Sequence, residues 1–381
     1  MDFALSEEQK MLQGMARDFL QKECPKSLVR EVQKDPSGHP RELWRKMAEL
    51  GWQGLVVPER YGGTGGSFLD LMVLIEEMGG ACLPGPFFCT TVLGALTLTG
   101  AGTEEQKREL LPLIARGEAI ITMALVEVSD RWDAEGIQCN AQVKGDTYVI
   151  NGTKLFVPYA HIADQLIVAA RTSVSDVPES GITLFLVNRK TEGITITVLN
   201  SINADKQCEV QFHDVEISSD RMVGQSGGGW PVIQRTLERA TVAKCVEMVG
   251  GAQQVLDMTI QYAKERMQFG RPIGSFQAIQ HRCADMAIDV DGSRFIAYLA
   301  AWKLSEEMPC PREVSIAKSW VSEAYRRVTK AGHQVHGGIG FTLDHDMHLY
   351  FRNAKAFASA FGNANWHLNK IVNDDTSTDV I

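Results

Sequence analysis

The stretch "RMQFGRPIGSFQAIQHRCADM", residues 266–286, carries the strongest signal in the sequence. Arg266, Phe269 and Gln277 frame a turn that joins two segments of helical periodicity. An arginine can clamp a pyrophosphate through paired N–H donors, and a glutamine can hydrogen-bond to an adenine or ribose edge. The pattern therefore indicates a dinucleotide contact, although on composition alone a plain polar turn between two helices is an equal alternative.

A second stretch, "HQVHGGIGFTLDHDMHLYFRNAKA", residues 333–356, favours the ligand interpretation. Its G-G-x-G run allows the backbone to come close to a bulky ligand, because glycine has no side chain. Three nearby histidines, His336, His345 and His348, raise the alternative of a metal site. No pattern of carboxylates and cysteines completes such a site, so we predict no metal.

The hydrophobic pattern divides the chain into three parts. Residues 1–118 show helical spacing of apolar residues, and residues 119–228 hold short β-branched segments separated by Gly, Asn, Asp and Pro. The helical period returns over residues 229–381. The order α, β, α predicts an α+β multi-domain fold with a helical domain, a sheet domain and a second helical domain.

Three local features give expectations that a structure can test. Ser6 is expected to cap the first helix. Pro112 is expected to interrupt the helix that begins near Thr103. The Asn-Gly pair of "INGTK", residues 150–154, is expected to form a two-residue hairpin turn.

Composition excludes several classes of protein. The chain has 381 residues, is 44% hydrophobic and 22% charged, and carries a net charge of −9 without long runs of one sign. Nothing in this distribution suggests a nucleic-acid or membrane partner. The eight cysteines form no CxxC pair, and no apolar run is long enough for a signal or a membrane span. We therefore expect a soluble, cytoplasmic protein with reduced thiols.

The two motifs together resemble those of the acyl-CoA dehydrogenases. The pairing of R-x-Q-F-G-x-P-I-x-x-F-Q with Q-x-x-G-G-x-G is similar to that family's, as are "LSEEQ", "VPERYGGTGGSFLDL", "GTEEQKRELLPLIARGE" and "YVINGTKLFV". The resemblance covers essentially the whole chain. It implies the acyl-CoA dehydrogenase fold: an N-terminal helical domain, a central β domain and a C-terminal four-helix bundle that mediates assembly into a tetramer.

The resemblance also implies an FAD cofactor. Arg266, Phe269 and Gln277 match family positions that hold the pyrophosphate and adenine of the FAD of a neighbouring subunit. The family's other dinucleotide contacts match a further set of positions, which is Gln334, Gly337 and Gly338.

On the flavin side the sequence departs from the family pattern. In "MALVEV", residues 123–128, Leu125 matches a cofactor contact, but Val126 stands where the family has a threonine. Phe156 takes the position of a tryptophan over the flavin, which conserves an aromatic ring. Pro158 replaces a second threonine, so a side-chain hydrogen bond is lost.

The family's reaction needs a carboxylate that removes the α-proton of an acyl thioester. The usual position of this glutamate corresponds to Phe361, and a less common position corresponds to Ala240. Glu247 lies seven residues after Ala240, so it points to nearly the same helix face about 10 Å further along. We predict that Glu247 is the base, and that Gly250 and Gly251 leave space for a ligand. The alternative is a surface ion pair between Glu247 and Lys244.

Other acids near these segments are weaker candidates. Glu127 and Asp130 match the flavin side, although a structural hydrogen-bonding role is expected for them. Asp344 and Asp346 fall in a segment that shapes the family's substrate pocket, although solvated loop acids are equally expected there.

The run "LERATVAKCVEMVGG" resembles a branch of the family that acts on bulky thioesters, such as steroid or ring-bearing acyl-CoA, and includes α2β2 assemblies. The function implied is FAD-dependent dehydrogenation of a bulky or branched acyl-CoA, with electrons passed to an electron-transfer flavoprotein by a homo- or heterotetramer. Two alternatives stay open: a non-catalytic partner subunit, and a flavin-dependent lyase or desulfinase on the same fold.

Overall fold

The computed structural model describes residues 4–378 and divides into two compact units. One unit gathers the first 30 residues, residues 68–83 and the chain from 241 onward, and the other holds residues 31–67 and 84–240. The predicted α+β architecture of N-terminal helices, a central sheet and C-terminal helices is confirmed. The three-domain boundaries at residues 118 and 228 stay a prediction.

The N-terminal third is helical because local signals start and stop each helix. Ser6 caps the first helix, as predicted: its hydroxyl accepts from the Gln9 amide, and the Gln9 side chain accepts from the Ser6 amide. Thr103 and Gln106 repeat this capping box before the sixth helix. The helices are α1 (Glu7–Glu23), α2 (Lys26–Lys34), α3 (Arg41–Glu49), α4 (Phe68–Ala81), α5 (Leu96–Ala101) and α6 (Glu104–Ala115), with a short 3₁₀ turn η1 (Glu59–Tyr61) and a π-helix η2 (Phe88–Ala95).

Pro112 does not interrupt its helix, so that expectation was wrong. Pro112 lies inside α6, which continues to Ala115. The amide of Arg116 donates to the Pro112 carbonyl, and Leu110, Leu111 and Ile114 are buried. Burial of this apolar face outweighs the single backbone hydrogen bond that proline cannot donate.

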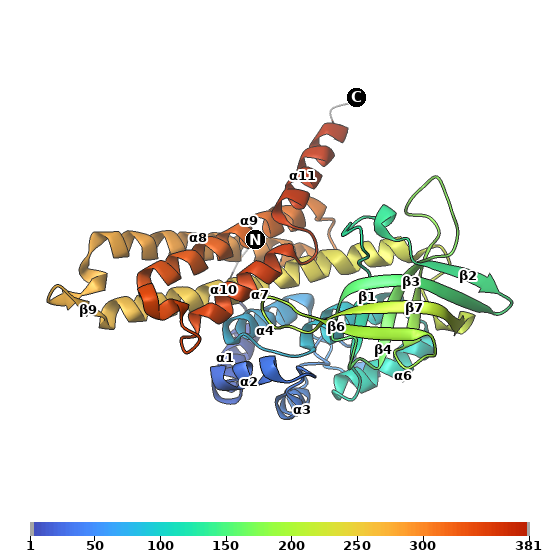
Figure 1. Ribbon diagram of the computed structural model, residues 1–381, viewed down its shortest axis with the longest axis horizontal. Coiled ribbons are helices and arrows are strands. Elements are labelled where there is room, and N and C mark those ends of the chain that lie inside the picture. The colour runs from blue at the N-terminus through green and yellow to red at the C-terminus, as the bar shows by residue number, and fades with distance from the viewer. Residues whose placement is uncertain (1–3, 379–381) are drawn as a thin grey trace. The chain divides into compact units, whose positions relative to one another are not determined.

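An eight-stranded sheet forms the core of the second unit (Figure 1). Its order is β6-β7-β3-β2-β4-β5-β8, and β1 pairs in parallel with β4. β4 and β5 are almost wholly buried, as their unbroken apolar sequences require, whereas β6 at the edge is half-exposed. The strands are β1 (Ile121–Ala124), β2 (Asn140–Lys144), β3 (Thr147–Pro158), β4 (Gln165–Arg171), β5 (Ile182–Asn188), β6 (Ile194–Leu199), β7 (Gln207–Ser218) and β8 (Met222–Val223), with turns η3 (Ala134–Gly136) and η4 (Ser219–Arg221).

The Asn151–Gly152 pair is not a hairpin turn, which corrects the prediction. Both residues lie inside β3, where the pairing with β7 shifts register between Ile150 and Gly152. The tight turn falls instead at residues 145–146, between Lys144 and Thr147. Gly152 has φ +148°, and a Cβ there would lie 2.9 Å from Cys139 Cα, so the glycine serves a bulge.

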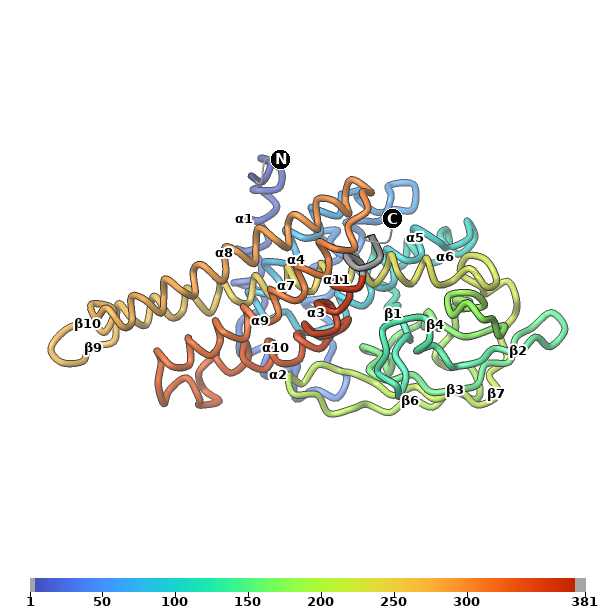
Figure 2. The backbone as a smooth tube through the Cα atoms, turned by 90° about the horizontal axis from the view of Figure 1, so that it is seen from above, coloured from blue at the N-terminus to red at the C-terminus, as the bar shows by residue number. Residues whose placement is uncertain are grey.

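Long helices form most of the C-terminal part. α7 (Gly229–Glu265) begins in the second unit and continues in the first, where the hairpin of β9 (Met267–Gln268) and β10 (Arg271–Pro272) joins it to α8 (Figure 2). The remaining elements are η5 (Ile273–Ser275), α8 (Gln277–Ser305), α9 (Pro311–His336), η6 (Gly337–Phe341), α10 (Met347–Ser359) and α11 (Ala364–Thr378). No helix in residues 4–378 is long and apolar enough to cross a membrane.

α4 and α7 pack so closely that glycine is required on both helices. A Cβ at Gly79 would lie 2.0 Å from the Glu247 carbonyl oxygen, and one at Gly250 would lie 1.8 Å from the Glu76 carbonyl oxygen. Real carbon–oxygen contacts are never so short, so either substitution must push the helices apart.

The glycines after Glu247 therefore serve packing, and the expectation that they leave space for a ligand was wrong. Gly250 is covered by the backbone of α4. Gly251 faces α9, where a Cβ would lie 2.4 Å from the Tyr325 hydroxyl. Both positions are filled by protein.

We expect Gly250→Ala to lower the free energy of unfolding by about 3 kcal/mol, because the added methyl group overlaps the α4 backbone. Urea unfolding followed by circular dichroism measures the change. Gly14→Ala is the matched control, since Gly14 lies in α1 where an added Cβ would meet no atom within 4 Å, and it should gain up to about 1 kcal/mol. Equal stability of Gly250→Ala and the parent protein would contradict this account of the helix contact.

Candidate active site

Glu247 lies on α7 with only 16% of its side chain exposed. Its carboxylate forms an ion pair with the ammonium group of Lys244, one helical turn earlier. The alternative of a surface pair was therefore right about the partner and wrong about the surface, because only 10% of the Lys244 side chain is exposed. The pairing keeps a carboxylate in a largely desolvated place.

The C-terminal end of α10 lies against this ion pair. The Lys244 ammonium nitrogen sits 4.1 Å from the centroid of the Phe357 ring, a cation–π contact. The Phe357 and Ala358 carbonyls accept hydrogen bonds of 3.0 and 2.9 Å from Lys318 Nζ. Burial lowers the pKa of Lys318 to about 8. Two buried lysines thus fix the end of α10 beside Glu247.

The turn at Phe361, which the sequence resemblance matches to the family's usual glutamate, is well fixed and has no carboxylate. Phe361 has φ +58° and is followed by Gly362 at φ +91°. His367 Nε2 donates a 3.0 Å hydrogen bond to the Phe361 carbonyl, which leaves Nδ1 to accept from the Ser315 hydroxyl at 3.3 Å. Burial lowers the pKa of His367 to about 4, so the ring is neutral near pH 7.

The β9–β10 hairpin presents the predicted dinucleotide-binding side chains to solvent. Phe269 is 91% exposed at the tip, with φ +52°. Arg266 precedes the hairpin and Gln277 begins α8, and both are exposed. The Arg271 guanidinium lies 4.2 Å from the Phe276 ring centroid and stiffens the hairpin. An exposed arginine beside an exposed aromatic ring suits a ligand or a partner chain.

The G-G-x-G segment lies at the same end of the unit. Tyr262, on the last turns of α7, stacks on His336 at the end of α9 with ring centroids 4.5 Å apart. Gln334 is exposed, and a Cβ at Gly337 or Gly338 would meet no atom within 4 Å. The backbone of these two glycines is therefore open to a ligand, unlike Gly340, which packs on His336. The structure brings all six predicted dinucleotide-binding residues of this unit to one end.

Three histidines near this segment are held by other contacts. His336 Nδ1 bonds to the Gly332 carbonyl at 2.8 Å, His348 Nε2 bonds to the Leu343 carbonyl at 3.1 Å, and His345 Nδ1 accepts from the Met347 amide at 3.2 Å. Within residues 4–378 there is no group of three His, Cys, Asp or Glu side chains that could hold a metal ion. Asp346 pairs with Arg30 at 2.6 Å.

A buried ion pair organises the predicted flavin side of the sheet unit. Lys154 is fully buried, and its Nζ donates to Glu127 Oε1 at 2.7 Å and to the Leu125 carbonyl at 3.1 Å. The Glu127 carboxylate also accepts from the Gln138 and Cys139 amides at 3.0–3.1 Å. This carboxylate is saturated, so its role is structural, as expected.

The residues around this pair are apolar, and two of their backbone amides are free. Leu125 and Val126 are buried, and the Val126 carbonyl accepts from the Leu155 amide at 2.8 Å. In the described part of the chain the amides of Val126 and Glu127 donate to no other group. Phe156 is 53% exposed with φ +52°, at a bulge where β3 shifts register against β7. Such a backbone is strained and recurs at functional sites.

These features fall into separate groups. Leu125 and Phe156 belong to the sheet unit, whereas Glu247 and the six residues at the end of α7 and α9 belong to the other unit. Glu247 lies on α7 and Arg266 directly follows its last residue, so the two are 19 residues apart, which is about 28 Å along the helix axis. The structure therefore does not bring Glu247 and Arg266 into one site of a single chain.

Sequence reasoning missed Lys154, Lys318 and His367. Lys154 had a usable signal, because it falls on the same inward-facing register as Tyr148 and Ile150 in β3. An inward lysine requires a buried carboxylate partner, which points to Glu127. Lys318 and His367 had no such signal, since neither has a carboxylate partner and both bind backbone carbonyls that only the tertiary fold brings near.

Three sequence profiles match the chain, and all three describe domains of one protein family. Sequence profiles described as the N-terminal, middle and C-terminal domains of acyl-CoA dehydrogenase match residues 6–118, 122–215 and 227–374. The chain is 36% identical to "Probable acyl-CoA dehydrogenase YngJ" of Bacillus subtilis over 93% of its length and 94% of the relative's.

Two solved structures are similar over nearly the full length. A chain of the ChsE4–ChsE5 complex from Mycobacterium tuberculosis superposes with a TM-score of 0.91 at 30% identity, and the match covers 100% of this chain and 100% of that one. A variant of the Tcur3481–Tcur3483 steroid ACAD has a TM-score of 0.87 at 31% identity, covering 98% of this chain and 99% of that one.

We expect Lys154→Met to lower the free energy of unfolding by about 3–5 kcal/mol, because it leaves the Glu127 carboxylate buried without its cation. Urea unfolding at pH 7 measures the change. Lys144→Met is the matched control: it removes the same charge from the same sheet, but the Lys144–Glu216 pair is exposed, so the unfolding midpoint should stay unchanged. Equal changes in the free energy of unfolding for the two substitutions would show that the Lys154–Glu127 pair does not organise the segment around Leu125 and Glu127.

Proposed function

Because this chain belongs to the acyl-CoA dehydrogenase family, we propose that it carries out FAD-dependent α,β-dehydrogenation of a bulky or branched acyl-CoA thioester. The observation that carries the proposal is the largely buried carboxylate of Glu247 on α7. The two positions where the family places its glutamate correspond to residues 240 and 361, and neither of these is an acid in this chain. We propose Glu247 as the base that removes the α-proton.

The surroundings of Glu247 support this role. The Lys244 ammonium group holds the Glu247 carboxylate in place through their ion pair. The Phe357 ring shields the pair from water on one side. Transfer of the α-proton to a Glu247 oxygen neutralises the acid, so the Lys244 charge is no longer balanced by it. That charge is then suited to attract the thioester oxygen as negative charge develops there.

The residues that would hold FAD fit such a group. Gly337 and Gly338 leave open backbone where a Cβ would otherwise stand, and Arg266 offers a guanidinium group to a pyrophosphate. Gln277 and Gln334 are exposed beside them, and Phe269 offers a ring. On the sheet unit, the exposed Phe156 ring, Leu125 and the free amides of Val126 and Glu127 would hold the flavin ring. When bound, FAD supplies a hydride acceptor.

We propose that each cofactor is shared between two chains. Glu247 and Arg266 are about 28 Å apart along the axis of α7. This separation supports the arrangement, since it is too long for both side chains to contact the same part of one cofactor. The exposed tip at Phe269 is then buried by a neighbouring subunit. We propose a homo- or heterotetramer in the cytoplasm that passes electrons to an electron-transfer flavoprotein.

A bulky substrate is supported by the apolar replacements and by the similar proteins. Val126 and Pro158 remove two side-chain hydroxyls that would contact the flavin edge, and Glu247 stands about 10 Å further along the helix than position 240. An acyl group must therefore lie deeper along α7. One structure of similar fold over 98% of this chain is described as a steroid ACAD.

We expect Glu247→Gln to slow flavin reduction by about 10²–10⁴-fold, because the amide cannot accept the α-proton. Flavin absorbance after mixing with branched and ring-bearing acyl-CoA thioesters measures the rate. Glu323→Gln is the control, since Glu323 pairs with Arg326 on the exposed side of α9 and should reduce at the parent rate. Undiminished reduction in Glu247→Gln would remove this residue from the mechanism.

A non-catalytic partner subunit is the second candidate function. The observation that favours it is the ion pair of Glu247 with Lys244, together with the loss of three family side chains at 126, 158 and 361. Such a subunit would complete a neighbour's FAD site through Arg266 and the G-G-x-G backbone without removing a proton itself.

Flavin retention separates the two functions. For the enzyme, we expect the chain expressed alone to purify with FAD, and Arg266→Gln to lose most of it because a charge-assisted contact to pyrophosphate is gone. Flavin absorbance relative to protein measures this, with Arg326→Gln as an exposed control on α9. A chain that purifies without flavin and gains it only with a second subunit would support the partner role.

A further inference from the structure

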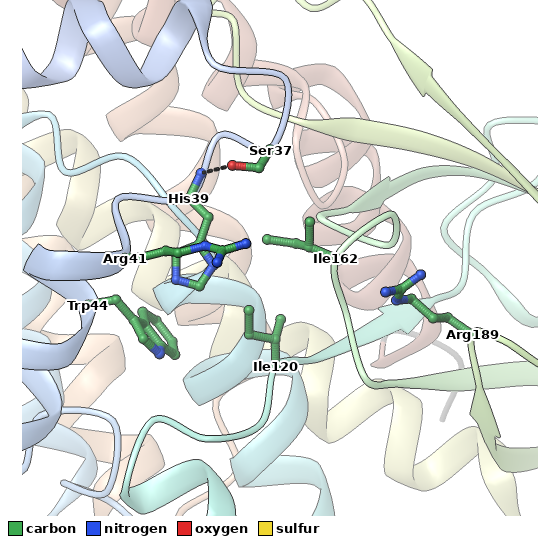
Figure 3. Close-up of a pocket in the computed structure, with 7 residues that line it drawn as sticks. All are labelled: Ser37, His39, Arg41, Trp44, Ile120, Ile162 and Arg189. Atoms are coloured by element: carbon green, nitrogen blue, oxygen red, sulfur yellow. Dashed lines mark hydrogen bonds between the residues drawn. The ribbon is translucent and has the colours of Figure 1, made fainter.

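A cavity of about 330 Å³ lies within the sheet unit, away from the residues discussed above (Figure 3). The first turn of α3 and the loop before it form one wall, and the ends of the sheet strands form the other. Its volume is at the small end of the range for ligand sites. The lining residues are Ser37, His39, Arg41, Trp44, Ile120, Ile162 and Arg189.

The cavity holds positive charge that the described part of the chain does not balance. Arg41 and Arg189 form no ion pair with any carboxylate in residues 4–378. Arg189 Nε and His39 Nε2 are buried and make no hydrogen bond within that part of the chain. Burial lowers the pKa of His39, and the Arg41 charge lowers it further. A buried guanidinium N–H without an acceptor is costly and rare, so Arg189 Nε indicates that an anion is the natural partner, and Arg41, which is exposed, adds positive charge to the lining.

A nearby acid, Asp35, is already engaged. Its carboxylate accepts from the Ser37 hydroxyl and amide at 2.6 Å and from the Gly38 amide at 3.3 Å. It therefore shapes the loop before α3, and within residues 4–378 it forms no ion pair with either arginine.

Apolar side chains form the rest of the lining. Trp44 is held in place because its Nε1 donates to the Gly117 carbonyl at 2.8 Å, and the His39 ring meets it edge-on at 5.5 Å. Ile120 and Ile162 complete the apolar surface. Figure 3 shows Arg41, His39 and Trp44 on one side of Ile120 and Ile162 and Arg189 on the other.

We propose that this cavity binds a small organic acid, with its carboxylate on the arginines and its apolar body on Trp44, Ile120 and Ile162. Arginine holds a planar carboxylate through two parallel N–H donors, and the apolar lining disfavours a fully hydrated inorganic anion. The site differs from the proposed catalytic one, and its existence does not depend on the proposed function.

The cavity is placed to influence the flavin side of the sheet. Ile120 directly precedes β1, which leads to Leu125, and Ile162 lies four residues after Pro158 at the end of β3. These two segments of the strand-end wall are joined because the Ile120 amide donates to Asp164 Oδ2 at 2.9 Å and the Ile120 carbonyl accepts from the Asp164 amide at 2.7 Å. A bound acid would therefore stiffen the base of both strands.

Isothermal titration of the full-length protein with benzoate and cyclohexanecarboxylate tests the site. We expect saturable binding of both acids and no binding of benzamide, which has the same shape without the charge. Arg41→Met and Arg189→Met should each weaken binding at least about tenfold, because each removes a charged hydrogen bond. Lys190→Met is the matched control, since this exposed neighbour of Arg189 does not line the cavity.

A second variant keeps the test independent of the arginines. Ile162→Trp fills a half-buried part of the lining without changing charge, and it should abolish binding while the melting temperature stays near that of the parent. No binding of either acid to the parent protein, or equal affinity in Arg189→Met and the parent, would overturn the site. Inorganic phosphate binding as tightly as benzoate would overturn the assignment to organic acids.

Discussion

The close contact between α4 and α7 is the constraint on which the proposed base depends. Gly79 and Gly250 let the two backbones touch, so the carbonyl of Glu247 is fixed against α4. The end of α4 is itself tied down: the Gly80 carbonyl accepts from the Tyr350 hydroxyl at 2.7 Å and from Lys26 Nζ at 3.2 Å. A carboxylate anchored on such a rigid backbone has little freedom, which is what proton abstraction at one carbon requires.

Buried lysines hold the segments that we propose to carry function. Lys154 joins the Glu127 carboxylate to the Leu125 carbonyl, Lys318 holds the last carbonyls of α10, and Lys244 pairs with Glu247. The first two satisfy buried acceptors within the fold, so they are structural. Lys244 differs because its partner is the proposed base, and the same contact that stabilises the carboxylate also limits its access to a substrate.

Much of the fold follows from local sequence signals. The caps at Ser6 and Thr103 and the apolar runs of β4 and β5 specify helices and strands directly. The errors arose where tertiary packing decides: Asn151–Gly152 forms a bulge instead of a turn, and Pro112 stays helical because its neighbours are buried. Gly250 and Gly251 were misread because sequence does not reveal that another helix, and not a ligand, fills the space. The candidate site came from a family resemblance, since residues as distant as Leu125 and Gly337 show no local relation.

The exposed hairpin at Phe269 has a genetic consequence under the proposed sharing of cofactors. Each chain then contributes the proposed base Glu247 to one active site and the dinucleotide-binding hairpin, the clamp, to the active site of a neighbouring chain. A lesion in the clamp and a lesion in the base damage different centres when they occur on different chains. Mixed assemblies of two defective alleles would therefore regain some intact centres, whereas a chain carrying both lesions would spread its damage to its neighbours.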